Sequence, residues 1–171
     1  MSRRLLLRRA VPSDVPGLEA LERACFTHPW TEAQLHEELA GGSRGAMLVL
    51  EGPGARGRDR LRGYCAFRLV LDEMHVMNVA IAPPERRRGL ARWLLRFAMR
   101  AAARKGASRA LLEVRAGNRE AVALYESLGF RRLGLRREYY REPLEDALVL
   151  VRERLEASRA PGGPEGPEPE S

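Results

Sequence analysis

Cysteine and histidine are scarce in this sequence, with two cysteines and three histidines among 171 residues. Cys25 and Cys65 form no Cys-x-x-Cys pair, and no cluster of histidines lies near either of them. A structural zinc site needs about four such ligands at close spacing, so no metal site is expected. Two half-buried free thiols are what we expect in a reducing compartment.

Long apolar runs are also missing. A helix that crosses a membrane needs roughly 18 or more apolar residues in succession, and no stretch of the chain comes close. Near the start, the apolar run covers residues 5–7 and arginines follow at once, which excludes the hydrophobic core of a signal peptide. These absences predict a cytoplasmic protein without a membrane partner.

Lysine is nearly absent, because Lys105 is the only one among 30 basic residues, and the net charge is +7. The planar fork of arginine suits bidentate contacts with phosphate, so a phosphate-bearing partner is one explanation. A GC-rich genome, which favours arginine codons over lysine codons, explains the same composition. Composition leaves both explanations open, and the positions of the arginines have to decide between them.

The chain is long enough for one domain with a buried core. Its apolar patterns and capping residues predict an α+β fold, in which about four helices flank a mixed, mostly antiparallel twisted sheet of about seven strands. The domain is predicted over residues 1–156, and the Pro-, Gly- and Glu-rich residues 157–171 are expected to form a disordered tail. Strands are predicted at residues 5–9, 47–50, 61–71, 76–81, 110–114, 131–139 and 146–151, a turn-rich loop at 52–60, and helices at 14–24, 31–41, 90–105 and 118–128.

The most basic loop, Arg-Arg-Arg-Gly-Leu-Ala at residues 86–91, lies between the fourth predicted strand and a long predicted helix. The first turn of a helix presents unpaired backbone N–H groups and the positive end of the helix dipole. Small residues such as Gly89 and Ala91 let a phosphate approach that backbone closely. The loop therefore predicts an anion site, and a solvated basic turn is the alternative.

Three polar residues stand out at positions where the pattern predicts buried or capping residues. Glu113 interrupts an apolar strand, where it serves either catalysis or an ion pair with Arg115 or another arginine. Tyr125 lies on the inner face of the next helix, where ordinary core packing is the alternative to a catalytic role. Asn118 has the position of the N-cap of that helix.

Together these residues resemble the GNAT acetyltransferase superfamily. The acyl-CoA signature of the superfamily, Gln/Arg-x-x-Gly-x-Gly/Ala, is met by Arg86-x-x-Gly89-x-Ala91, with alanine in place of the commoner last glycine. The blocks at residues 112–118 and 123–130 are similar to the RimI-type ribosomal-protein-alanine N-acetyltransferases. The likeness covers about residues 4–153.

The resemblance implies direct transfer of an acetyl group from acetyl-CoA, a co-substrate used without a metal, to the N-terminal amine of a protein. The implied acceptor is the N-terminal alanine of a small-subunit ribosomal protein, or another protein N-terminus. We expect a monomer without a DNA partner. Glu113 would be the general base, through a water, and Tyr125 would protonate the departing thiolate. The implied acetyl-CoA contacts are Val79, Ala80, Ile81, Arg86, Arg87, Arg88, Gly89, Leu90, Ala91, Arg92 and Asn118, and the implied peptide contacts are Phe26, Trp30, Tyr139 and Tyr140.

Three other functions stay open at this point. A GNAT enzyme for a small-molecule amine is one, although a polycationic substrate would call for an acidic cleft and this chain is basic. A non-catalytic acyl-CoA-binding module is another, but it would not need both Glu113 and Tyr125. A nucleic-acid binder fits the net charge and the regular arginine face of the long helix, although no aromatic stacking platform accompanies that face.

Overall fold

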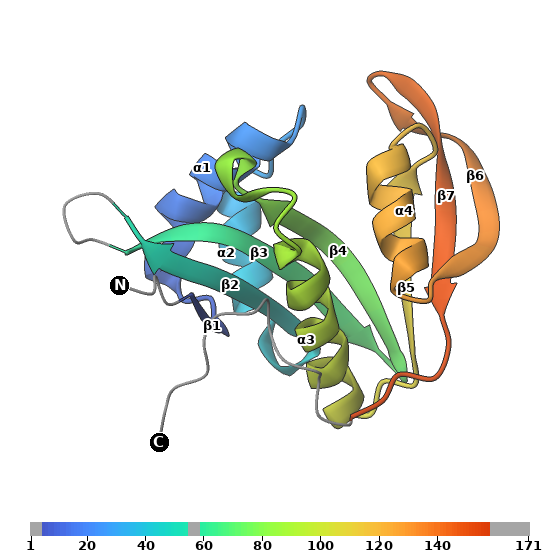
Figure 1. Cartoon of the computed structure of the whole chain (residues 1–171), viewed down its shortest axis with the longest axis horizontal. Helices are drawn as coiled ribbons and strands as arrows, with labels where there is room; N and C mark the ends of the chain where they lie inside the picture. Colours follow the sequence, from blue (N-terminus) through green and yellow to red (C-terminus); the bar gives the residue numbers. More distant parts are fainter. Residues whose placement is uncertain (1–4, 55–58, 158–171) are drawn as a thin grey trace.

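Seven strands form one open sheet in the order β1-β2-β3-β4-β5-β7-β6, and four α-helices pack against it (Figure 1). Neighbouring strands are antiparallel except for β4 and β5, which are parallel. The predicted fold class and order of elements are confirmed. The strands are β1 (Leu6–Arg9), β2 (Gly45–Pro53), β3 (Asp59–Val70), β4 (Glu73–Ile81), β5 (Arg109–Arg115), β6 (Arg131–Arg141) and β7 (Leu144–Arg152), and the α-helices are α1 (Val15–Cys25), α2 (Glu32–Ala40), α3 (Leu90–Arg104) and α4 (Arg119–Ser127).

The computed structural model describes residues 5–54 and 59–157. The predicted tail therefore lies outside the described residues except for Ala157, as do residues 55–58 of the loop predicted at residues 52–60. Within the described residues, β2 continues through Pro53, because its last residues pair with the start of β3. None of the described helices combines the length and the apolar character that a membrane span requires.

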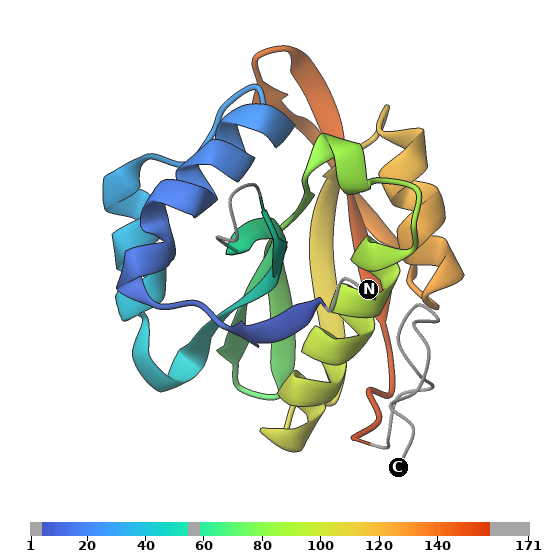
Figure 2. The same ribbon diagram turned by 60° about the vertical axis from the view of Figure 1, so that its left-hand side comes forward.

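The sheet separates two hydrophobic cores, because successive side chains of a strand point to opposite faces. On β2, Met47 and Val49 pack with α1 and α2, whereas Leu48 and Leu50 pack with α3 and α4. Figure 2 shows the two helix pairs on opposite sides of the sheet. Cys65 is fully buried in the second of these cores, where burial raises its pKa to about 12, so the prediction of two half-buried thiols is correct for Cys25 alone.

A buried carboxylate connects α1 to the middle of the sheet. Glu22 is 0% exposed, and its Oε2 accepts a hydrogen bond from the backbone N–H of Trp30 at 2.7 Å. Its Oε1 accepts from the Tyr64 hydroxyl and from Nδ2 of Asn78, the latter at 3.2 Å. Burial and the adjacent Glu22 carboxylate raise the pKa of Tyr64, so its hydroxyl stays a donor. Glu22 thus fixes the loop between α1 and α2 to β3 and β4.

Replacing Glu22 with alanine is expected to lower the free energy of unfolding by about 3 kcal/mol, because one buried and two half-buried donors lose their acceptor. Chemical denaturation followed by circular dichroism measures this change. The matched control is Glu19→Ala on the same helix, whose carboxylate forms an exposed ion pair with Arg23 at 3.3 Å. Such a pair contributes less than about 1 kcal/mol. Equal losses in the two variants would contradict a special role for Glu22.

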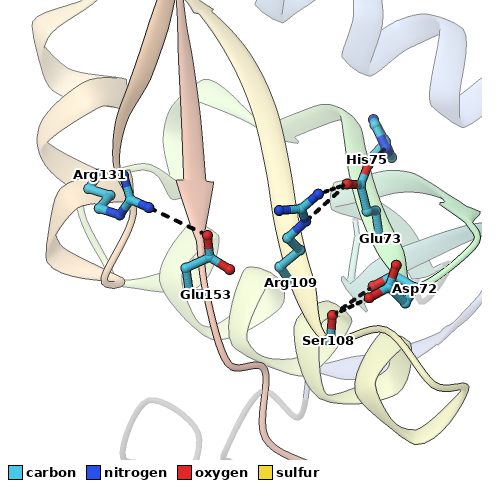
Figure 3. A network of polar contacts seen from close by, with 7 residues as sticks. All are labelled: Asp72, Glu73, His75, Ser108, Arg109, Arg131 and Glu153. Carbon is cyan, nitrogen blue, oxygen red and sulfur yellow. Dashed lines mark hydrogen bonds and ion pairs between the residues drawn. The ribbon is translucent and has the colours of Figure 1, made fainter.

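Polar contacts hold β4 and β5 together at the end where both strands begin (Figure 3). Nε of Arg109 donates to Oε1 of Glu73 at 2.9 Å, and Nε2 of His75 lies 2.8 Å from Oε2 of the same carboxylate. The Arg109 guanidinium and then His75 lower the pKa of Glu73, so this carboxylate is ionised at neutral pH. The hydroxyl of Ser108 donates to Asp72 at 2.7 Å. Because Glu73 already pairs with Arg109 of β5, strand β4 starts there, three residues before its predicted start.

Candidate active site

The two central strands separate after a short stretch of pairing. Among the described residues, β4 pairs with β5 only at Glu73–His75, opposite Arg109–Leu111. On its other edge β4 remains paired with β3 as far as Ile81. Met77 lies in a bulge there, because Ala66 pairs with Asn78 and Phe67 with Val76. Beyond His75, none of the described strands pairs with the edge of β4 that faces β5, so the backbone groups of this edge are available to a ligand.

A cavity of about 400 Å³ opens where the strands separate. This volume lies in the usual range for sites that bind small molecules and cofactors. Its walls come from the end of α1, the end of β4, the loop before α3 and the start and inner face of α4. The lining residues are Cys25, Phe26, Val79, Ala80, Ile81, Glu85, Arg86, Arg87, Gly89, Leu90, Ala91, Arg92, Asn118, Glu120, Ala121, Leu124 and Tyr125.

The basic loop reaches this cavity in a conformation that depends on glycine. Gly89 is the N-cap of α3 and has a φ of +75°, in the left-handed region that glycine adopts without strain. A Cβ added at Gly89 would meet no atom within 4 Å, so the space in front of the helix N-terminus is open. The first N–H groups of a 15-residue helix therefore face a site that an anion can enter.

The three loop arginines have different surroundings. Nε of Arg86 donates to the carbonyl of Ile81 at 3.1 Å and so ties the loop to the end of β4. Arg88 forms an ion pair with Glu85 and is absent from the cavity lining, although we had predicted it as an anion contact. The Arg87 side chain is exposed, and its Nη1 lies 4.0 Å from a carboxylate oxygen of Glu120. Arg86 and Arg87 line the cavity.

The start and inner face of α4 form the opposite wall. Oδ1 of Asn118 accepts a hydrogen bond from the backbone N–H of Ala121 at 3.2 Å, so the predicted N-cap is confirmed, and the same residue lines the cavity. Tyr125 also lines the cavity and packs edge-to-face on Phe130, with ring centroids 5.8 Å apart. Burial raises the pKa of Tyr125, with smaller contributions from Cys65 and Tyr140. Its phenol is therefore protonated at neutral pH and available as a hydrogen-bond donor.

Glu113 lies outside the cavity lining, in the middle of β5. Its neighbours Leu112 and Val114 are buried in the core, and Glu113 points to the other face with its side chain 28% exposed. Its Oε1 is 2.9 Å from Nε of Arg136. An ion pair was one of the two predicted explanations for this carboxylate, and its partner is Arg136 rather than Arg115.

Two adjacent tyrosines of β6, Tyr139 and Tyr140, interact electrostatically with Glu113. A hydrogen bond to Glu113 is the main cause that raises the pKa of Tyr139, whereas burial and then Glu113 raise the pKa of Tyr140. The two rings contact each other edge-to-face at 5.1 Å. The Arg115 guanidinium lies 4.1 Å from the centroid of the Tyr140 ring. Neither Glu113 nor the two tyrosines are among the residues that line the cavity.

The structure brings together the two segments predicted to hold a peptide. Nε2 of His28, in the loop between α1 and α2, lies 2.8 Å from the carbonyl of Glu142 in the turn between β6 and β7. Phe26, from the same loop, lines the cavity. Trp30 does not line it, and instead packs against the core beneath α1 and α2. The loop thus contributes one ring to the cavity and one to the core.

Comparison with known proteins assigns this arrangement to a family. The acetyltransferase (GNAT) family matches residues 15–130, which is more than half of the chain. The chain belongs to the GNAT acetyltransferases. Residues 15–130 include the end of β4, the basic loop and α4, so the match covers every wall of the cavity.

Relatives within this acetyltransferase family cover most of the chain. The chain is 35% identical over 141 residues to the ribosomal protein bS18-alanine N-acetyltransferase of Salmonella typhimurium, covering 81% of this chain and 90% of the relative. It is 37% identical over 147 residues to the N-alpha-acetyltransferase RimI of Mycobacterium tuberculosis, covering 82% and 87%. The crystal structure of the ribosomal-protein-S18-alanine N-acetyltransferase from Escherichia coli matches with a TM-score of 0.78 at 29% identity, covering 94% of this chain and 100% of that one.

Five lining residues of this GNAT acetyltransferase were not predicted from the sequence. Ala121 and Leu124 share the inner face of α4 with Tyr125, so helical spacing gave a signal for them. Cys25, whose Sγ donates to the carbonyl of Ile81 at 3.4 Å, reaches the cavity only because α1 packs beside β4. Glu85, just before the basic loop, and Glu120, in the first turn of α4, also line the cavity, and no local sequence pattern indicates this.

Two substitutions of Asn118 separate its capping role from its role in the cavity. Serine is as good an N-cap as asparagine, so Asn118→Ser is expected to keep the stability of the protein, whereas Asn118→Ala is expected to lower the free energy of unfolding by about 1 kcal/mol. Both variants lose the amide that lines the cavity, and both are expected to bind acetyl-CoA about tenfold more weakly, a change of about 1.4 kcal/mol. Thermal denaturation and calorimetric titration measure the two effects. Unchanged acetyl-CoA affinity in Asn118→Ser would mean that Asn118 caps α4 and does not contribute to acetyl-CoA binding.

Proposed function

We propose that this GNAT acetyltransferase transfers acetyl from acetyl-CoA to the N-terminal alanine of ribosomal protein bS18, or of a closely similar protein N-terminus. The observation that carries the proposal is the cavity, which has a helix N-terminus at one end and the Tyr125 phenol among its lining residues. The names of the Salmonella and Escherichia coli relatives supply the acceptor. Such an acceptor places the enzyme in the cytoplasm, where we expect it to act as a monomer.

The residues of the cavity fit acetyl-CoA from end to end. The pyrophosphate is held by the backbone N–H groups at the start of α3, with Gly89 leaving room for it and Arg87 adding charge. The unpaired edge of β4 over Val79–Ile81 hydrogen-bonds the amides of the pantetheine arm, as an added strand would. A backbone N–H of the same edge polarises the thioester carbonyl.

Tyr125 and Glu113 divide the proton transfers between them. The amine nitrogen attacks the thioester carbon, a C–N bond forms and the C–S bond breaks. The amine loses its proton through a water to Glu113, which the structure places beyond the cavity lining. The departing sulfur receives a proton from the Tyr125 phenol, which burial keeps protonated until that moment. Solvent exchange then restores both groups.

An N-terminal amine suits this machinery better than a lysine side chain. Only the neutral amine attacks, and an α-amine with a pKa of about 7.7–8.0 is already partly neutral near pH 7.5. A lysine with a pKa of about 10.4 would need roughly 3 kcal/mol more to reach the same state, at about 1.36 kcal/mol per unit. The partly exposed Glu113 carboxylate, acting through a water, is an adequate base for the α-amine and a weak one for a lysine.

A panel of short peptides tests the proposal. The full chain is incubated with acetyl-CoA and peptides that begin with alanine, serine, methionine or proline, and mass spectrometry locates the acetyl group. One more peptide carries a blocked α-amine and a free internal lysine. We expect acetylation of the alanine peptide at its α-amine and none of the blocked peptide. Preferred acetylation of the lysine, or of none of the peptides, would contradict the proposal.

A further inference from the structure

Helix α3 carries a row of four arginines, and only the first of them reaches the proposed acetyl-CoA site. Arg92, Arg96, Arg100 and Arg104 follow one another at intervals of four residues, so they form a stripe along one side of the helix, which we call the α3 stripe. Only Arg92 lines the cavity. The other three continue away from it, with Arg96 and Arg104 exposed and Arg100 lying over the Phe97 ring at 5.1 Å.

The α3 stripe lacks neutralising partners. Within residues 5–54 and 59–157, no carboxylate oxygen lies within 4 Å of any of its four guanidinium groups. Like charges four residues apart on a helix destabilise it by about 0.2–0.5 kcal/mol per pair, and a cation in the first turn opposes the helix dipole. The stripe therefore weakens the isolated helix, whereas a merely solvated surface normally mixes both signs of charge.

The two faces of the molecule differ in charge. Helix α3 has four arginines and no acidic residue, whereas α2 on the opposite side of the sheet has three glutamates and no arginine or lysine (Figure 2). An anionic partner is consequently attracted to the α3 side and repelled from the α2 side. Helices α2 and α3 thus carry charge of opposite sign on opposite sides of the sheet.

The geometry of the α3 stripe favours a phosphate backbone as that partner. At 1.5 Å of rise per residue, successive arginines are about 6 Å apart along the axis and the row is about 18 Å long. This is a regular line of bidentate donors for a polymer with about one charge per 1.7 Å of duplex axis. The apolar side of α3 is buried in the core, and no large apolar side chain of the helix is exposed, so the helix has nothing to insert into a lipid layer.

We propose that the α3 stripe docks the enzyme on double-stranded RNA through phosphate contacts, without reading its sequence. The choice of RNA over DNA rests on the proposed function, because a ribosomal protein assembles with RNA and not with DNA. Docking through α3 raises the local concentration of the acceptor near the cavity, since the stripe starts at Arg92 on the cavity wall. The absence of an aromatic stacking platform fits a duplex better than a single strand.

The test compares two triple variants that carry the same net charge. Arg96→Gln, Arg100→Gln and Arg104→Gln together remove the part of the stripe outside the cavity. The control combines Arg132→Gln, Arg137→Gln and Arg141→Gln, three exposed residues of β6. Fluorescence anisotropy with a labelled RNA duplex of about 20 base pairs, without acetyl-CoA, gives the affinity of the full chain at several salt concentrations. The full chain is used so that every charge of the sequence is present in the measurement.

We expect the stripe variant to bind the duplex at least tenfold more weakly than the wild type near 100 mM salt. The slope of log affinity against log salt concentration should fall by about 2–3, close to one unit per lost phosphate contact. Both triple variants should acetylate a short alanine peptide at the wild-type rate. Equal RNA binding by the two triple variants, or tighter binding of a DNA duplex of the same sequence, would overturn the inference. If the wild type acetylates the peptide but does not bind RNA, the RNA-docking inference is wrong and the proposed function stands. If it binds RNA but does not acetylate the peptide, the proposed function is wrong and the RNA binding stands.

Discussion

Replacing Tyr125 with phenylalanine is expected to lower kcat about 10²–10⁴-fold, the range that a single general acid or base contributes. The change removes one hydroxyl and keeps the ring that packs on Phe130. Acetyl-CoA affinity should stay near that of the wild type, because the phosphate and pantetheine contacts come from other residues. Glu113→Gln is expected to lower kcat in the same way, since the amide keeps the shape of the carboxylate and loses its basicity. Steady-state kinetics with an alanine peptide measures both losses.

A control for the missing hydroxyl is available in Tyr64. Its hydroxyl donates to Glu22 on the opposite face of the sheet and does not line the cavity. Tyr64→Phe should therefore reduce the free energy of unfolding but leave kcat of the folded enzyme close to the wild type. If Tyr125→Phe and Glu113→Gln both turn over substrate at the wild-type rate, neither residue has the chemical role proposed for it.

Gly89→Glu is expected to weaken acetyl-CoA binding about 100-fold, equivalent to about 2.7 kcal/mol. The new side chain points into the open space before the helix N-terminus, where its carboxylate takes the place of the phosphate and repels the approaching anion. The φ of +75° also costs a residue other than glycine about 1–2 kcal/mol, which lowers the stability of the folded protein. Isothermal titration calorimetry with acetyl-CoA measures the change in affinity.

The matched control for this substitution lies at the other end of the same helix. Gly106 also has a positive φ, +98°, and a Cβ there would also meet no atom within 4 Å. Gly106→Glu introduces the same charge with a comparable backbone strain, about one helix length from the phosphate site. It should bind acetyl-CoA with wild-type affinity. Similar losses of affinity in the two variants would mean that backbone strain, and not a phosphate site at Gly89, explains the effect.

Helix α3 was the element most readily predicted from the sequence, and the reasons are local. Its apolar positions repeat at helical spacing, Gly89 starts it and Gly106 follows its end. The capping box of α2, from Thr31 to Gln34, was equally local and is present. The same reasoning placed Tyr125 and Asn118 on one helix and so on one wall of the cavity. Short-range periodicity therefore accounts for most elements and for much of the site.

Features that depend on tertiary contacts were out of reach. Nothing near Glu22 in the sequence indicates a fully buried carboxylate, because its donors come from β3, β4 and the loop after α1. Arg136 is 23 positions away from Glu113, so its choice as the ion-pair partner over nearby Arg115 follows from the pairing of β6 with β7. Trp30 was predicted at the peptide site by resemblance, whereas the structure packs it into a core that sequence spacing could not reveal.

The early separation of β4 from β5 gives the two halves of β4 different exchange behaviour. Amide hydrogens in the first half are bonded in ladders on both edges, so they exchange with solvent only when the sheet opens. Amide hydrogens that point from the second half of β4 toward its unpaired edge exchange with solvent without any opening of the sheet. In the proposed complex the pantetheine arm fills the gap as an added strand would, so we expect acetyl-CoA to slow deuterium uptake along this edge and release of CoA to restore it. If the proposed function is correct, each catalytic cycle covers the open edge of β4 once and then exposes it again.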